Sequence, residues 1–178
     1  MNQEQRAFIG LGSNLKSPER QMLAAFDALA ATPGVRLTKR SSLYRTAPIG
    51  YANQPDFLNA AAEIHTRLSP LELLEALLAI ERSHGRVREF PNAPRTLDLD
   101  ILIYGDLQIS SGQLTVPHPR AHLRAFVLMP LLEIAPDCVI PGLGPARALL
   151  DQVRAQEVTH VAEEVTFRLA LGSLAGAV

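Results

Sequence analysis

The sequence contains one cysteine, no tryptophan and no long run of apolar residues. A single thiol cannot form an intrachain disulfide, so Cys138 fits a reducing compartment. No apolar stretch approaches the length that crosses a bilayer, and the first apolar run, residues 7–11, is too short for the core of a secretion signal. We therefore expect a cytoplasmic protein without a membrane partner.

The sequence also has almost no excess of one charge over the other, with 17 basic and 18 acidic residues. The formal net charge is −1 over 178 residues, which argues against a general nucleic-acid coat, and 47% hydrophobic residues are typical of a globular chain. This length suffices for one hydrophobic core, so we expect a single domain over residues 1–178. The positive charge is carried by fifteen arginines and only two lysines. Arginine suits bidentate phosphate recognition better than lysine does.

Several familiar catalytic and nucleotide-binding patterns are missing. Gly10-x-Gly12 follows an apolar run, as in a dinucleotide-binding fingerprint, but Leu15 stands where the third glycine is required. The sequence has no P-loop and no arrangement typical of a Ser-His-Asp or Cys-His nucleophile. A bound nucleotide must therefore be held by other means.

The most informative stretch is residues 95–104, where two aspartates interrupt an apolar run. Residues two apart in a strand point to the same face, so Asp98 and Asp100 should project together. The opposite face would carry four core residues, Leu97, Leu99, Ile101 and Ile103. Adjacent carboxylates repel each other and lose hydration, so a positive partner should compensate them. That partner is either a divalent cation or the neighbouring arginines.

Six arginines surround this pair between residues 82 and 124: Arg82, Arg86, Arg88, Arg95, Arg120 and Arg124. Taken singly, each is most simply a solvated surface charge, and an Asp-x-Asp pair can simply face water. Together they indicate a polyphosphate held between guanidinium groups and carboxylate-bound Mg²⁺. Magnesium usually binds through one or two carboxylates plus substrate phosphates, so two aspartates are enough.

Apolar periodicity and turn residues predict the elements in the order β-α-β-β-α-β. Strands are expected over 6–12, 35–46, 57–66 and the aspartate-bearing segment to 104. Helices are expected from Ser17-Pro18 to Pro33, and from the capping box Ser69-x-x-Glu72 to Gly85. The later expected elements are a hairpin over 108–116, helices over 120–132 and 147–155, and a strand over 165–171. This order is typical of an α+β protein with a ferredoxin-like βαββαβ core. We expect a mixed or antiparallel sheet, helices on one face, and an additional C-terminal hairpin and helices.

Arg86-Val87-Arg88, followed by Ala93-Pro94-Arg95-Thr96-Leu97-Asp98-Leu99-Asp100, closely resembles the signature of the 6-hydroxymethyl-7,8-dihydropterin pyrophosphokinase family. The resemblance begins at Ile9-Gly10-Leu11-Gly12-Ser13-Asn14-Leu15. Further matching motifs occur at 44–48, 54–59, 114–118, 124–126 and 130–136. The resemblance covers residues 8–142 in the right order, and residues 143–178 would extend the same domain.

The resemblance implies transfer of pyrophosphate from ATP to the hydroxymethyl group of the pterin, with release of AMP, in folate biosynthesis. It implies two Mg²⁺ ions on Asp98 and Asp100, with ATP as co-substrate. The residues it marks as catalytic are Arg86, Arg95, Asp98 and Asp100. The residues it marks as ATP-binding are Glu81, Arg86, Arg88, Arg95, Ile101, Leu114, Thr115, His118 and Arg124. The residues it marks as pterin-binding are Thr46, Ala47, Ile49, Phe57, Asn59 and Phe126.

This chain departs from the family pattern at three positions. Asn92 stands where many relatives carry a tryptophan, Leu78 replaces a polar residue, and Gln113 replaces an arginine. A flat pterin ring should stack between Phe57 and Phe126. Loops 47–56 and 86–94 flank the expected site, and we expect them to close over bound substrates and exclude water.

Two other classes of function remain open from the residues alone. A metal-dependent nuclease or nucleotidyl transferase could use Asp-x-Asp, but it should carry a further acidic ligand. An RNA-binding module of the same fold should show surface aromatics on a central strand, where this chain carries aspartates that would repel phosphate. We therefore expect small-molecule substrates, no nucleic acid, and a monomer.

Overall fold

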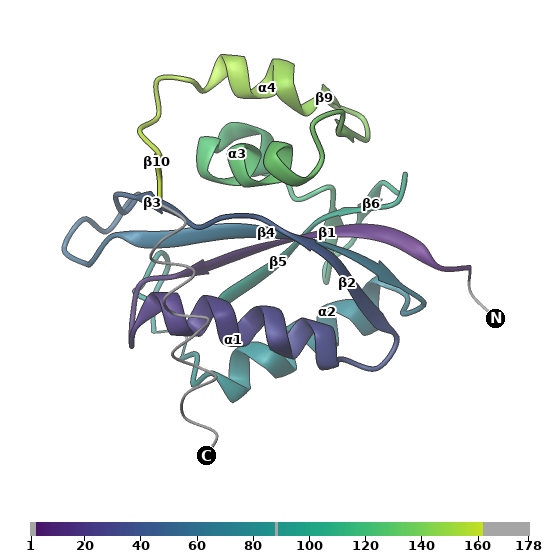
Figure 1. Ribbon diagram of the computed structural model, residues 1–178, viewed down its shortest axis with the longest axis horizontal. Helices are drawn as coiled ribbons and strands as arrows, with labels where there is room; N and C mark the ends of the chain where they lie inside the picture. The colour runs from purple at the N-terminus through teal and green to yellow at the C-terminus, as the bar shows by residue number, and fades with distance from the viewer. Residues whose placement is uncertain (1–2, 88, 162–178) are drawn as a thin grey trace.

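The structure is a computed structural model that describes residues 3–87 and 89–161. Its main sheet has six strands in the order β10-β3-β4-β1-β5, with β2 also paired to β4, and every pairing is antiparallel (Figure 1). The elements are β1 (Gln5–Ser13), α1 (Pro18–Ala31), β2 (Val35–Arg40), β3 (Tyr44–Thr46), β4 (Phe57–Thr66), α2 (Pro70–Ser83), β5 (Asp98–Tyr104), β6 (Ile109–Ser110), β7 (Thr115–Val116), a 3₁₀ turn (Ala121–Leu123), α3 (Ala125–Ile134), β8 (Val139–Ile140), β9 (Gly144–Pro145), α4 (Ala146–Gln152) and β10 (Thr159–His160). The predicted α+β class with an antiparallel sheet is confirmed.

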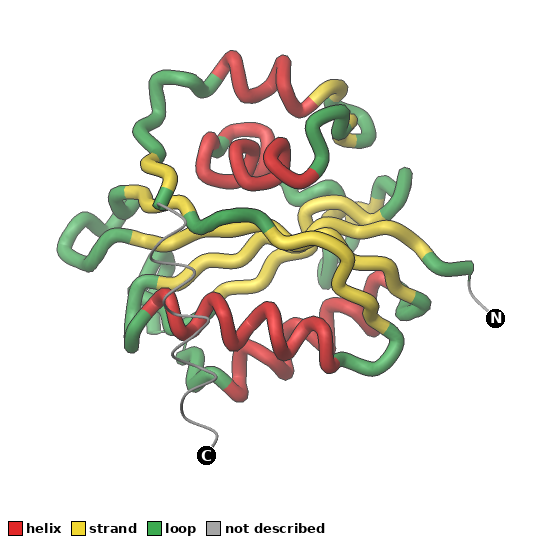
Figure 2. The backbone as a smooth tube through the Cα atoms, viewed as in Figure 1, coloured by secondary structure: helices red, strands yellow, loops and turns green. Residues whose placement is uncertain are grey.

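The sheet carries helices on both faces. Figures 1 and 2 show α1 and α2 along one face, and α3 and α4 over the other. The two helices of the predicted core share one face, as expected, whereas the additional C-terminal helices cover the other face, which was not predicted. After β5 the chain passes through the β6–β7 hairpin and returns across the opposite face, where α3 packs on β4. Because α3 lies between the sheet and α4, it buries apolar side chains around most of its surface.

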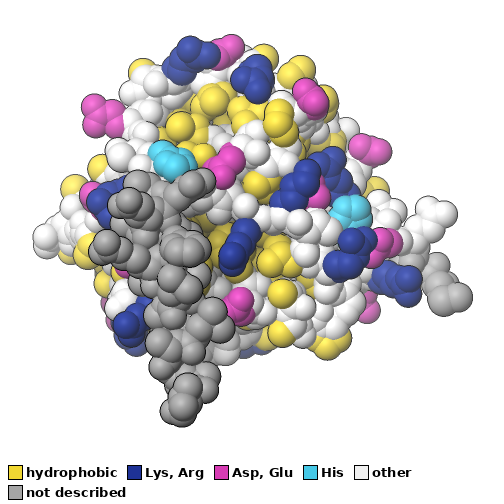
Figure 3. Space-filling view, in the orientation of Figure 1, with side chains coloured by type: hydrophobic (Ala, Val, Ile, Leu, Met, Phe, Trp, Pro, Cys, Tyr) yellow, Lys and Arg dark blue, Asp and Glu magenta, His cyan; other side chains and the backbone are white. Residues whose placement is uncertain are grey.

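Two hydrophobic cores therefore lie on opposite sides of the sheet. The first core, beneath α1 and α2, includes Phe26 and Leu77. The second core, beneath α3 and α4, includes Phe8, Leu128 and Leu149. Within the part of the chain that the structure describes, no helix is long and apolar enough to cross a membrane. On the face drawn in Figure 3, basic and acidic side chains are interspersed.

The alternation of β5 holds only for its first half. Leu99 and Ile101 pack in the first core as predicted, but Ile103 packs in the second core beside Leu102. The reason is a shift in register between β1 and β5, at which β5 gains one residue relative to Phe8 and Ile9. β5 also lies at the edge of the sheet and not at its centre, which corrects the sequence interpretation.

Several predicted boundaries also change. The strand expected over 35–46 is two strands with residues 41–43 between them, where the Ser41 hydroxyl accepts a hydrogen bond from the Ala61 amide. The helix expected over 120–132 is a 3₁₀ turn and then α3, separated by the extended backbone of Arg124. α4 covers part of the helix expected over 147–155, and β10 was not predicted. The predicted strand at 165–171 lies outside the described residues.

The helix starts show which capping signals form in the folded chain. Ser69 and Glu72 form the predicted capping box, with the Glu72 amide 3.3 Å from the Ser69 hydroxyl oxygen. α1 begins at Pro18 as expected, but Ser17 has left-handed backbone angles and its side chain caps nothing. The predicted β6–β7 hairpin is confirmed.

Candidate active site

The floor of the main cavity is the sheet itself, at two glycines of β1. Gly12 lies between Asn59 of β4 and Asp98 of β5, and Gly10 lies opposite Asp100. Both glycines line the cavity. A Cβ on Gly12 would stand 3.5 Å from the Asn59 side-chain oxygen, so the missing side chain leaves open space above the sheet. Gly10-x-Gly12 therefore shapes a cavity floor, which is a different role from a dinucleotide fingerprint.

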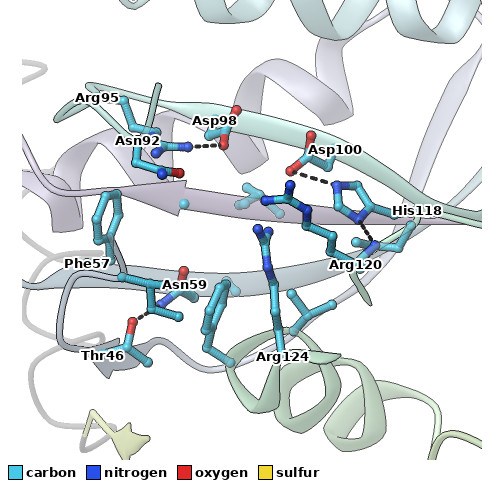
Figure 4. A pocket seen from close by; sticks show the side chains of 18 of the residues that line it. Thr46, Phe57, Asn59, Asn92, Arg95, Asp98, Asp100, His118, Arg120 and Arg124 are labelled. Carbon is cyan, nitrogen blue, oxygen red and sulfur yellow. Dashed lines mark hydrogen bonds and ion pairs between the residues drawn. The ribbon is translucent and has the colours of Figure 1, made fainter. Parts of the chain in front are cut away.

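One end of this cavity is aromatic and mostly uncharged. All six residues expected to bind pterin line it together: Thr46, Ala47, Ile49, Phe57, Asn59 and Phe126. The Asn59 side-chain amide donates to the Thr46 hydroxyl at 3.0 Å, which fixes the orientation of the amide (Figure 4). The Arg95 guanidinium lies over the Phe57 ring, 5.2 Å from its centroid. This end presents two rings and one fixed amide oxygen.

The middle of the cavity holds the two aspartates on one face of β5, as predicted. Asp98 accepts hydrogen bonds from Arg86 and, at 2.7 Å, from Arg95. Burial alone would raise the pKa of Asp98, but the charge and hydrogen bonds of Arg86 and Arg95 outweigh burial and lower it. Of the two compensating partners considered from the sequence, arginines are thus present at Asp98.

Asp100 has a different environment. Within residues 3–87 and 89–161, its nearest basic group is His118, whose Nε2 lies 4.0 Å from the carboxylate. Burial, followed by the negative charges of Asp98 and Glu81, raises the pKa of Asp100 to about 7. Burial, followed by the charge of Arg124, lowers the pKa of His118. The Asp100 carboxylate is therefore the more weakly compensated of the two.

Glu81 of α2 binds both Arg86 and the backbone of β5. Its carboxylate accepts from the Leu99 amide at 2.8 Å and from Arg86 at 3.0 Å. Because β5 is an edge strand, its outward amides need partners, and Glu81 supplies one of them. Glu81 is almost fully buried and lines neither cavity. It positions Arg86 and the β5 backbone.

A second, larger cavity adjoins the first beneath loop 86–94. Seven residues line both cavities and form the waist between them: Asn92, Arg95, Asp98, Asp100, His118, Arg120 and Arg124. Arg86 lines the second cavity only. The carboxylate pair and three arginines thus stand where the two cavities meet.

Not every expected site residue lies in these cavities. Ile101 and Leu114 pack in the first core, and Thr115 lies exposed on β7. None of these three residues lines either cavity. Arg88 lies outside the described residues.

The structure also adds site residues that sequence reasoning missed. Gly10 and Gly12 are two residues apart, as are Asp98 and Asp100, and this common spacing is the feature of the sequence that could have indicated a shared face. Arg120 was counted among the arginines but not assigned to the site, although it lines the waist.

The loops above the site contact each other. The Gln54 side chain donates to the Asn92 carbonyl at 3.1 Å and accepts from Asn14 at 2.9 Å. The rings of Tyr51 and Phe90 meet edge to face with centroids 5.3 Å apart. Loop 47–56 and loop 86–94 are therefore joined by a polar and an aromatic contact.

The donor chemistry of the waist suits magnesium. Asp98 and Asp100 offer carboxylate oxygens from one strand face, and Mg²⁺ prefers oxygen ligands with the remainder supplied by phosphate and water. Among residues 3–87 and 89–161, no group of three or more His, Cys, Asp or Glu side chains is placed to hold a metal. The pair fits an ion that is shared with a bound phosphate and would not form a closed protein site.

The fold and the site together define an α+β protein whose cavity joins paired carboxylates and arginines to an aromatic end. A profile of the 7,8-dihydro-6-hydroxymethylpterin-pyrophosphokinase (HPPK) family matches residues 8–136. The chain belongs to this family and is a pyrophosphokinase, as its motifs predicted.

Named relatives agree with this assignment. A 2-amino-4-hydroxy-6-hydroxymethyldihydropteridine pyrophosphokinase of Pseudomonas aeruginosa is 49% identical over 137 residues, or 77% of this chain and 85% of the relative. The enzyme of the same name from Methylorubrum extorquens is 50% identical over 144 residues, or 81% and 91%. The HPPK-DHPS structure of Plasmodium falciparum matches with a TM-score of 0.68 at 15% identity, which concerns the fold alone. That match covers 85% of this chain and 46% of the longer one.

Proposed function

We propose that the protein transfers pyrophosphate from ATP to the hydroxymethyl oxygen of 6-hydroxymethyl-7,8-dihydropterin and releases AMP, as a step of folate biosynthesis. The observation that carries this proposal is the position of the carboxylate pair. Asp98 and Asp100 stand at the waist between an aromatic cavity and an arginine-lined cavity. Two substrates bound on either side would meet at the carboxylates.

The smaller cavity, of about 170 Å³, would take the pterin. Its ring would stack between Phe57 and Phe126, because flat heteroaromatic rings favour such offset contacts. The fixed Asn59 oxygen and the backbone of Thr46, Ala47 and Ile49 would read the polar ring edge. The pterin alcohol would then point toward the waist.

The larger cavity, of about 510 Å³, would take ATP. Arg86, Arg88, Arg95, His118 and Arg124 would surround its phosphates. The side chains of Ile101 and Leu114 are buried, so we assign their contribution, with that of Thr115, to backbone groups beside the base and ribose. Glu81 would act through Arg86, which it holds.

Asp98 and Asp100 would hold two Mg²⁺ ions that neutralise the charge of the phosphate chain when bound. The alcohol oxygen attacks the β-phosphorus in line with the departing oxygen of AMP. Arg95 and Arg124 would fix the phosphate chain, and the aromatic end would fix the alcohol. Positioning and charge neutralisation supply most of the rate enhancement, as in other phosphoryl transfers.

The proposal also includes the topology of the core, the number of domains, the oligomeric state and the cellular location. The order of strands and helices supports a ferredoxin-like core, in which β2 and β3 together take the place of one strand. We propose one domain over residues 1–178, acting as a monomer. We place the enzyme in the cytoplasm, because its single cysteine fits a reducing compartment.

The experiment is an assay of pterin-dependent AMP formation from Mg-ATP, with side-chain variants as internal controls. Asp100→Asn and Asp98→Asn should lose activity by several orders of magnitude, because each removes an ion ligand. Asp151→Asn is the matched control, since Asp151 is exposed on α4 and pairs only with Arg154 among the described residues. Formation of ADP, or equal activity in all three variants, would refute the proposal.

A further inference from the structure

The free guanidinium groups at the waist point to an additional phosphate-binding residue, Arg120. Of the arginines around the carboxylates, Arg86 and Arg95 each donate hydrogen bonds to Asp98. Within the described residues, the guanidinium of Arg120 makes no hydrogen bond or ion pair. Arg124 likewise has no carboxylate within ion-pair distance there, and its side chain contacts the Phe126 ring. Two of the waist arginines therefore keep their hydrogen-bonding capacity available.

The backbone holds Arg120 at this position. Its amide donates to Nδ1 of His118 at 3.1 Å, and its carbonyl accepts from the Leu123 amide at 3.1 Å. The 3₁₀ turn Ala121–Leu123 then separates Arg120 from Arg124 by a single turn. Figure 4 shows both side chains reaching into the pocket. The same turn therefore presents two guanidinium groups to one cavity.

Without a bound anion, the two positively charged guanidinium groups of Arg120 and Arg124 repel each other. Burial lowers the pKa of Arg124, and the positive charge of Arg120 lowers it further against the opposing effect of Asp100, as expected for neighbouring like charges. An exposed arginine with no partner would ordinarily extend into water, away from a second guanidinium. A phosphate group between the two would turn repulsion into two charge-assisted hydrogen-bonding interactions.

We propose that Arg120 and Arg124 form a phosphate clamp at the waist, in which Arg120 is a further binding residue for the polyphosphate chain of the nucleotide. This inference rests on the proposed function for the identity of its ligand. The four arginines then form two pairs with different roles. Arg86 and Arg95 bind both Asp98 and the phosphates, whereas Arg120 and Arg124 bind the phosphate oxygens alone. The ligand class is an inorganic or nucleotide polyphosphate.

Calorimetric binding of inorganic tripolyphosphate with Mg²⁺, at low ionic strength, tests the clamp without catalysis. Arg120→Gln should weaken binding about 10- to 100-fold, as expected for the loss of a charged hydrogen bond. Arg120→Lys should recover part of this loss, because it restores charge but not the planar fork. Arg147→Gln is the matched control, since Arg147 is exposed on α4 and lines neither cavity. This control should bind like the wild type.

A second measurement separates phosphate binding from a structural role. Affinity for 6-hydroxymethylpterin alone should be unchanged in Arg120→Gln, and the KM for ATP should rise. Wild-type tripolyphosphate affinity in Arg120→Gln, or a parallel loss of pterin binding, would overturn the clamp. If the wild type binds tripolyphosphate through Arg120 but forms no AMP, the proposed function fails and the clamp stands. If AMP is formed and Arg120→Gln matches the wild type, the clamp alone fails.

Discussion

At the scale of single residues, Asp98 and Asp100 share one face of β5 but differ in charge compensation. Two guanidinium groups bind Asp98, whereas among the described residues Asp100 has only His118, at 4.0 Å. The pKa of Asp98 is lowered, and that of Asp100 is raised to about 7. Asp100 is thus the residue at which added positive charge from a cation brings the larger gain.

This difference predicts a pH-dependent stability of the metal-free protein. The Asp100 carboxyl, with a pKa of about 7 when folded and 3.8 as a free side chain, binds more protons in the folded state between these values. The free energy of unfolding should therefore fall as pH rises through this window. Asp100→Asn removes that loss, so the variant should be about 1–2 kcal/mol more stable than the wild type at pH 8. We discount the full shift because 43% of the side chain is exposed.

The measurement is urea denaturation in EDTA at pH 4.5 and pH 8. The gain from Asp100→Asn should be present at pH 8 and nearly absent at pH 4.5, and Asp151→Asn should show neither effect. An Asp100→Asn variant with the same relative stability at both pH values would contradict the assigned environment.

A second residue-scale prediction concerns the cavity floor. Gly12→Ala should fold normally, because the added methyl group meets the Asn59 oxygen at an ordinary 3.5 Å. The methyl group would nevertheless occupy the floor between Asn59 and Asp98, so we expect the KM for the pterin to rise at least about tenfold. Gly112→Ala is the control, because nothing lies within 4 Å of a Cβ there. Unchanged kinetics in Gly12→Ala would show that the floor does not contact substrate.

Local spacing predicted the carboxylate pair, and the resemblance of short motifs to the family supplied the six pterin-side residues. The sequence did not predict that Gly10 and Gly12 lie beside Asp98 and Asp100. That neighbourhood depends on how β1 pairs with β5, two strands separated by more than eighty residues. Long-range register of this kind is not encoded in any short window.

At the scale of elements, the two loops above the site are coupled through the Tyr51–Phe90 contact. Tyr51→Ala and Phe90→Ala should each raise the KM for the pterin, because each removes the ring contact that joins the two loops. The effects should be non-additive, with a coupling of about 0.5–1.5 kcal/mol, typical of an edge-to-face ring pair. The measurement is a double-mutant cycle on kcat/KM, with Leu107→Ala as an exposed apolar control on another loop.

Hydrogen exchange provides a direct readout of the same coupling. Amides in loops 47–56 and 86–94 should gain protection when an ATP analogue and the pterin bind together, and less so in Phe90→Ala. Strictly additive kinetic effects, together with unchanged exchange in both loops, would show that the loops act independently.

Element boundaries were predictable where the signal was local. The capping box at Ser69 fixed the start of α2, since both partners lie within one turn. The phase change in β5 was not predictable, because it arises from the bulge opposite β1. The split of the helix expected over 120–132 was also not predicted. It occurs at Arg124, whose backbone is extended and which is itself a residue of the site.

At the scale of the whole molecule, the α+β class followed from the element order, but the placement of helices did not. Apolar periodicity shows that a helix has a buried face, yet it does not show which face of the sheet the helix covers. α3 and α4 lie on the face opposite α1 and α2, over the second core. This placement brings Arg124 and Phe126, at the start of α3, into the cavity.

The central claim is that the β- and γ-phosphates of ATP move together to the pterin. It is tested most directly by incubating the enzyme with the pterin alcohol and Mg-ATP that carries one isotope in the α-phosphate and another in the γ-phosphate. The account predicts that the α-label is recovered only in AMP and the γ-label only in the pterin diphosphate. Recovery of the α-label in ADP, with the γ-label on a pterin monophosphate or in free phosphate, would contradict it.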